Sequence, residues 1–104
     1  MMTNAEIGAM LDETGYVNAY HMVPEGTALP SVTFETPRAT PITADNKILM
    51  KATELEVNLY LAKHDSKAIK KVSDVLEEHG IIYSLEEEIL DDEKLYIERF
   101  NMEV

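Results

Sequence analysis

Residues 51–80, "KATELEVNLYLAKHDSKAIKKVSDVLEEHG", decide the fold because the hydrophobic period changes within them. In residues 51–62 apolar and mostly polar side chains alternate, with the apolar positions at Leu55, Val57, Leu59 and Leu61. This alternation predicts a strand of an antiparallel sheet with one covered and one wet face. From residue 66 the spacing becomes helical, through Ala68, Ile69, Val72, Val75 and Leu76. Asp65 or Ser66 can cap this helix and Gly80 can end it.

The segment before this strand predicts one helix and two further strands. Thr3 and Glu6 have the spacing of a capping box, and Gly15 can end the helix that follows. Residues 16–23 and 31–36 are rich in β-formers and predict strands. Residues 24–30 and 37–50, which hold all four prolines, are expected to be irregular loops. Four methionines are expected to fill the core: Met10, Met22, Met50 and Met102.

Behind the long helix the chain returns to strand, at residues 81–85 and 95–104. Between them "EEEILDDE", residues 86–93, places six acids in eight positions. The predicted order is α-β-β-β-α-β-β, a single α+β domain over residues 1–104. We expect one antiparallel or mixed sheet with the helices mainly on one face.

The acidic stretch has three interpretations: a hairpin tip, a cation site or a catalytic carboxylate cluster. A calcium loop requires a glycine at its sharp turn, and this stretch has none. Consecutive strand residues point to opposite faces, so Glu86, Glu87 and Glu88 cannot all converge. Asp favours turns. We therefore predict a solvated hairpin, with the cation site as the weaker alternative.

The composition argues against several kinds of function. The net charge of −11 is opposite to the basic surface that nucleic-acid binding requires. Without cysteine there is no disulfide, thiolate nucleophile or Cys-ligated zinc. The three histidines lack a short metal-ligand spacing, and the isolated glycines form no phosphate-binding loop. We expect no cofactor, no bound metal, no membrane span or secretion signal, and no enzymatic activity.

The two predicted loops are the candidates for contact with partners, because long loops in small domains are usually functional or disordered. Loop length, together with the family resemblance given in the next paragraphs, indicates the interface candidates, which are Pro24, Glu25 and Gly26 in one loop, and Ala44, Asp45, Asn46 and Lys47 in the other.

Several segments, taken in order, resemble a family of small proteins from the head–tail morphogenesis modules of tailed phages and prophages. These segments are "AYHMVPEGTALPSVTF" (19–34), "TADNKI" (43–48), "ELEVNLYLAKHD" (54–65), "VLEEHGIIY" (75–83) and "DDEKLYIERFNMEV" (91–104). The resemblance covers residues 19–104, and it rests on the ordered combination because no single segment is diagnostic.

The resemblance implies a tail-completion or tail-terminator protein, a minor structural component of the virion. Such a protein would form a ring, commonly of six subunits, at the head-proximal end of the tail. Its partners would be copies of itself, the tail tube protein and the head–tail connector proteins. It would lie in the host bacterial cytoplasm during assembly and then at the head–tail junction. If Asp91, Asp92 and Glu93 faced the lumen of the ring, their charge would repel passing DNA.

Two other classes of function compete with this structural role. A small regulatory or ligand-binding α+β domain would show a concave apolar pocket with convergent polar groups. A DNA-mimic inhibitor would bind a basic partner tightly and in a salt-sensitive way. The mimic is disfavoured because basic residues are interspersed among the acids.

Overall fold

A computed structural model describes the backbone of residues 2–44 and 47–104, and the side chains of residues 2–36 and 54–104. Over these residues the chain forms two α-helices, five strands and one short 3-10 helix. They are α1 (Asn4–Asp12), β1 (Val17–Tyr20), β2 (Ser31–Ala44), β3 (Lys47–Leu61), α2 (Ser66–Glu78), β4 (Tyr83–Leu90), η1 (Asp91–Glu93) and β5 (Leu95–Glu103). The element order and the α+β class are those predicted from the sequence.

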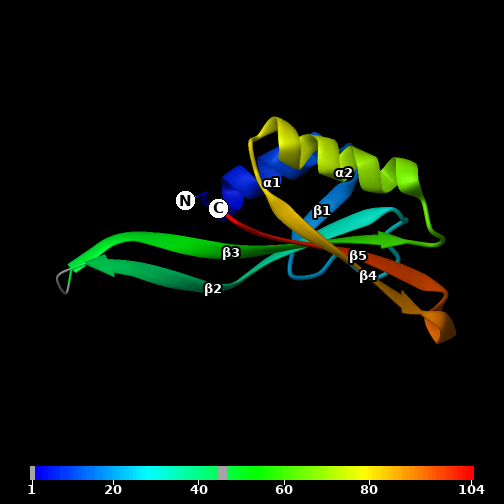
Figure 1. The fold of residues 1–104 in the computed structure, drawn as a ribbon. Coiled ribbons are helices and arrows are strands. Elements are labelled where there is room, and N and C mark those ends of the chain that lie inside the picture. The colour runs from blue at the N-terminus through cyan, green and yellow to red at the C-terminus, as the bar shows by residue number, and fades with distance from the viewer. Residues whose placement is uncertain (1, 45–46) are drawn as a thin grey trace.

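The five strands form one mixed sheet in the order β1-β2-β3-β5-β4. The short strand β1 runs parallel to β2, and all other neighbours are antiparallel. Strands β1 and β4 are therefore the two edges of the sheet. Both helices lie on the same face of it, as predicted (Figure 1). We call this the helix face and the opposite one the helix-free face.

The core fills the space between the helix face and the two helices. It contains apolar side chains from α1, β2, β3, α2 and β5, among them the predicted row on β3. Its buried members are Ile7, Met10, Leu11, Val32, Phe34, Leu55, Val57, Leu59, Leu61, Ala68, Val72, Val75, Leu76, Phe100 and Met102.

Both predicted helix starts are confirmed. Thr3 and Glu6 form a reciprocal capping box, and the Asp65 carboxylate accepts from the backbone N–H groups of Lys67 and Ala68. These caps fix where each helix begins.

The prediction of an irregular loop over residues 37–50 was wrong. Strand β2 continues to Ala44, and β3 begins at Lys47. Their pairing runs from Ser31↔Tyr60 to Ala44↔Lys47, with register shifts after Glu35 and after Ile42. Proline is tolerated here because both strands of a two-stranded ribbon are edge strands. A residue on such a strand whose N–H would point away from the partner strand needs no N–H for the ladder. We call residues 37–44 and 47–53 the arm, which extends well beyond the body of the sheet (Figure 1).

Three further details differ from the sequence predictions. The first strand covers only Val17–Tyr20, because His21 has a positive φ of 70° that ends the extended conformation. Met22 is 67% exposed and does not fill the core as expected. The strand predicted over residues 81–85 begins at Tyr83 and runs on to Leu90, because β4 pairs with β5 along its whole length. Met10 and Met102 do lie in the core, and the side chain of Met50 is outside the described residues.

Candidate functional site

The first predicted contact loop lies beside the body of the sheet. Pro24, Glu25 and Gly26 are all exposed. A turn holds them, in which the backbone N–H of Thr27 donates to the carbonyl of Pro24 at 3.1 Å, while Gly26 has a φ of 84° that favours glycine. Together with Tyr60 and other neighbours these three residues line a hollow of about 290 Å³.

The second predicted contact loop is at the far end of the arm. Ala44 and Lys47 are paired there across the β2–β3 ribbon, and Asp45 and Asn46 lie outside the described residues. Ala44 is ten residues along β2 from Phe34, which pairs with the end of β1. At the rise of a strand this separation is roughly 30 Å. The structure therefore does not bring the two groups of candidates into one site.

The acidic stretch forms a hairpin, as predicted. Strands β4 and β5 pair from Tyr83↔Met102 to Leu90↔Leu95, and η1 (Asp91–Glu93) connects them with all three acids exposed. Lys94 closes the turn in a left-handed conformation. The acids of β4 divide between the two faces, also as predicted: Glu87 is on the helix face, and its neighbours in sequence are on the helix-free face.

One group of acids and a histidine does converge, on the helix face near the β4–β5 edge. We call His64, Glu87 and Glu98 the His64 cluster. His64 lies between β3 and α2, Glu87 on β4, and Glu98 directly opposite Glu87 on β5. The potential ligand atoms of these three side chains all lie within 4.8 Å of one another. Among the described residues this is the one such group.

The three members of the His64 cluster differ in exposure. The side chain of His64 is 57% exposed, whereas that of Glu98 is only 2% exposed. His64 Nδ1 lies 2.9 Å from Glu87 Oε2 and 3.9 Å from Glu98 Oε1. Among the described residues, the Glu98 Oε1 atom has no hydrogen-bond partner. Glu98 is thus a buried acid that is incompletely satisfied.

Burial is the main reason why the pKa of Glu98 is raised, to about 7, and hydrogen bonding with Glu87 and the charge of Glu87 add to the effect. Because the two carboxyl groups interact, the pKa of Glu87 is lowered, first by its hydrogen bond with Glu98 and then by that with His64. The hydrogen bond to Glu87 in turn raises the pKa of His64. The pKa values of the two carboxyl groups are therefore driven apart: the buried Glu98 keeps its proton to a higher pH, and Glu87 loses its proton more readily.

The helix-free face has a different electrostatic character. Arg99 is bound there by Glu56 at 3.0 Å and by Glu88 at 3.1 Å, and it donates to Asn58 Oδ1 at 3.1 Å. The strand registers place six glutamates on this face: Glu35, Glu54, Glu56, Glu86, Glu88 and Glu103. The helix-free face is therefore an acidic surface with a central arginine.

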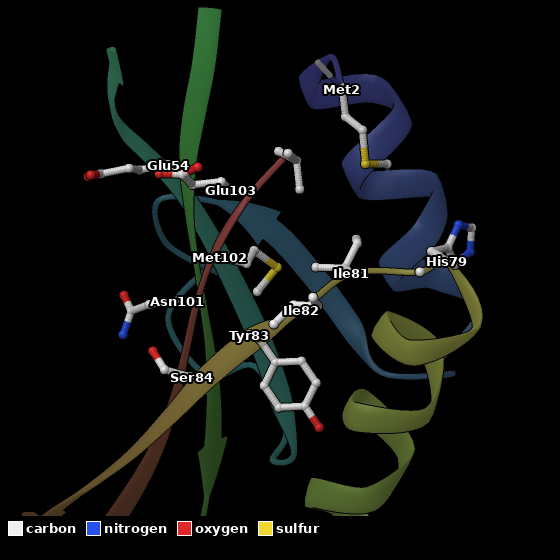
Figure 2. Close-up of a pocket in the computed structure, with 12 residues that line it drawn as sticks. Met2, Glu54, His79, Ile81, Ile82, Tyr83, Ser84, Asn101, Met102 and Glu103 are labelled. Atoms are coloured by element: carbon white, nitrogen blue, oxygen red, sulfur yellow. The ribbon is translucent and has the colours of Figure 1, made fainter. Parts of the chain in front are cut away.

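A groove of about 870 Å³ lies where the chain leaves α2 and enters β4. Figure 2 shows its lining, with Met2, Ile81 and Met102 on one side and Glu54, Ser84 and Asn101 on the other. The apolar part lies on the helix face and the polar part on the helix-free face. The groove is open, and its polar groups do not converge on a point as they do in an enzyme site.

Most of the large apolar side chains that are exposed lie along the two edges of the sheet. One group is on β1 and the other is on β4 and directly before it, while two further ones, Met22 and Leu29, are in the loop after β1, which lines hollows together with residues of β3. Among the described residues these side chains are Val17, Tyr20, Met22, Leu29, Ile82, Leu85 and Ile89. Both edges of the sheet therefore combine unpaired backbone groups with apolar surface.

Sequence reasoning missed Glu98, although the sequence contains its signal. Tyr96, Glu98, Phe100 and Met102 follow the two-residue period of β5, so the alternation itself places Glu98 on the apolar side. An acid at such a position is rare without a partner. The contact between Glu98 and His64 could not be predicted from the sequence, because the two residues are 34 positions apart in the chain.

A comparison of the sequence with protein-family models and with curated proteins finds no match. Among the described residues, neither helix has the length and apolar character needed to cross a membrane.

Proposed function

We propose that this chain is a non-enzymatic structural subunit of a tailed phage or prophage, acting at the head–tail joint as a tail terminator or tail-completion protein. The observation that carries this proposal is the distribution of exposed apolar side chains along both edges of one sheet. Exposed strand edges with apolar surface are the sites where chains pair with other chains. A subunit with two such edges can contact two neighbours at once.

The charges on the two edges favour a head-to-tail contact, in which β1 of one subunit meets β4 of the next. Pairing of two β4 edges would bring the glutamates at positions 86–88 of both chains together, and opposed like charges destabilise a sheet. Strand β1, with the sequence Val-Asn-Ala-Tyr, carries no charge. Head-to-tail contacts generate rings when the rotation closes. We propose a ring that is hexameric when assembled on the tail.

The arm supports the same proposal. Beyond Glu35 strand β2 pairs only with β3, and before Glu54 strand β3 pairs only with β2, over the described residues. An isolated two-stranded ribbon is marginally stable in water, so such an arm gains stability from a partner surface. In the assembled ring the arm and its end, with Ala44 and Lys47, would reach a neighbouring subunit or the tail tube. The loop of Pro24, Glu25 and Gly26 would contact the connector or the tube.

Acidic surfaces suit a channel for DNA. Asp91, Asp92 and Glu93 project from the tip of the β4–β5 hairpin, and the helix-free face adds further glutamates. A negative lumen would repel the phosphate backbone and let the genome pass without adhering. The subunit would bind no specific nucleic acid. It would assemble in the host bacterial cytoplasm and remain at the head–tail junction of the virion.

The test is electron microscopy of lysates after deletion of the gene from its phage or prophage. Free filled heads beside overlong or unfinished tails are the expected result. Tails of normal length beside filled or leaking heads would instead assign the protein to the head side of the joint. Intact infectious virions would overturn the structural proposal.

The alternative is a small regulatory or ligand-binding domain, and the groove in Figure 2 is the observation that favours it. It predicts saturable binding of a small molecule at this groove, detectable by chemical-shift changes at Ile81, Tyr83 and Met102 in a fragment screen. Shift changes confined to the sheet edges, which increase with protein concentration, would favour the structural role.

A further inference from the structure

We propose that His64, Glu87 and Glu98 bind a divalent transition-metal cation, with Zn²⁺ as the first probe. The site lies between the β3–α2 connection and the β4–β5 hairpin, so that one ion would link the two. This inference is independent of the proposed role at the head–tail joint.

The buried carboxylate is the first step of the argument. The side chain of Glu98 is only 2% exposed, and its Oε1 has no hydrogen-bond partner in the part of the chain that the structure describes. An unsatisfied buried acceptor is costly, and a buried carboxylate is retained when it is paired or coordinates a metal. The unpartnered atom is the one that faces His64, 3.9 Å from Nδ1. An ion placed between them would satisfy it.

The distances fit a metal site. Two ligands of a tetrahedral ion with bonds of about 2.0–2.2 Å lie roughly 3.4 Å apart. The separations of His64 Nδ1 from Glu87 Oε2 and Glu98 Oε1, 2.9 and 3.9 Å, lie on either side of this value. His64 and Glu87 are the more exposed members, so rotation of their side chains can adjust the geometry around the fixed Glu98.

The donor set selects the class of ion. One imidazole nitrogen and two carboxylate oxygens suit Zn²⁺ or Mn²⁺, whereas Ca²⁺ takes oxygen ligands and Mg²⁺ is usually held by carboxylates and water. Three protein ligands leave a coordination position for water or for a group from a neighbouring subunit. The two carboxylates balance the charge of a divalent ion.

The test is isothermal titration of Zn²⁺ into the full chain after removal of metals with a chelator. We expect one ion per chain, with an affinity that falls at least about tenfold in His64→Gln and in Glu98→Gln. The imidazole resonances of His64 should shift on binding in an NMR titration. Zn²⁺ should raise the melting temperature of the wild type and leave that of Glu98→Gln unchanged.

Two matched variants serve as controls. His79→Gln removes another histidine that contacts a single carboxylate, that of Glu13 at 2.7 Å, and Glu86→Gln removes the neighbouring acid on the opposite face. Both should bind Zn²⁺ as the wild type does. His64→Gln changes an exposed side chain, so its folding is not in question, and circular dichroism verifies the fold of Glu98→Gln. The proposal would be overturned if the wild type did not bind Zn²⁺. It would also be overturned if Glu98→Gln and His64→Gln bound Zn²⁺ as tightly as the wild type.

Discussion

Glu98 on β5 and Glu87 on β4 are direct partners across an antiparallel ladder, with their side chains on the same face, yet one is buried and the other is exposed. The difference arises because β4 is the edge of the sheet, whereas β5 lies between β3 and β4. A pair of acids at this position couples the ionisation of a core residue to that of a surface residue.

Glu98→Gln is expected to stabilise the metal-free protein at pH 8. The variant keeps the shape of the side chain and removes a buried charge that the structure satisfies incompletely. We expect the free energy of unfolding at pH 8 to rise by about 1–3 kcal/mol, because the neutral amide avoids the burial of a charge although it leaves a polar group at the same place. Urea denaturation in the presence of a chelator measures it, with Glu86→Gln as the surface control.

The wild type and the Glu98→Gln variant should also differ in how their free energy of unfolding depends on pH. The pKa of Glu98 is about 7 in the folded state, above the ordinary 4.5, so the folded state holds the proton more tightly. Stability from this group is therefore present at low pH and is lost as pH rises from about 4.5 through 7. His64, whose pKa is also raised, acts in the same direction, while the lowered pKa of Glu87 acts below this window. Wild-type stability should fall between pH 5.5 and 8 more than that of Glu98→Gln, and equal slopes would contradict this assignment.

Leu59→Ala should destabilise the protein strongly. Leu59 is fully buried in the middle of β3, where it is part of the core between the sheet and the helices. Truncation of a buried leucine leaves a cavity and costs about 2–5 kcal/mol. Ile82, which is 91% exposed, provides the control, since Ile82→Ala should change stability by about 0.5 kcal/mol or less. Denaturant titration of both variants checks the position of the core.

Charges placed on the two edges should separate head-to-tail from symmetric association. A charge on one edge should block pairing at that edge, and the two variants are Val17→Glu on β1 and Leu85→Glu on β4. Under conditions in which the wild type forms rings, each variant alone should be monomeric. A mixture of the two retains one intact β1–β4 contact and should form a heterodimer. Sedimentation velocity distinguishes these species. An oligomer of either variant alone, or a mixture that stays monomeric, would count against the head-to-tail ring.

The arm should be dispensable for folding. The described core is built from residues outside the arm. Replacing residues 38–53 with Asn-Gly, a dipeptide that suits a two-residue hairpin, should leave the unfolding free energy within about 1 kcal/mol of wild type. Assembly on tail tubes should be lost, as seen by cosedimentation. If the shortened chain were unfolded, the arm would be part of the domain core. If the shortened chain still cosedimented with tail tubes, the arm would not be part of the interface.

The sequence by itself determined the features that depend on neighbouring residues. The alternation of Leu55, Val57 and Leu59 specified the face of β3, the side chains of Thr3 and Asp65 specified where the helices begin, and the acids at 91–93 specified the turn of the hairpin. These are local effects of backbone geometry and hydrogen bonding, so they can be read from spacing alone.

Only the tertiary structure decided which strands became edges, how far β2 and β3 extend, and which polar groups meet. The prolines of residues 37–50 predicted a loop, but a ribbon with two open edges tolerates them because ladder hydrogen bonds are needed on one side only. His64 and Glu98 meet because β5 inserts between β3 and β4, a pairing that depends on contacts between distant segments. Strand order carries no local signal, and the candidate site depends on it.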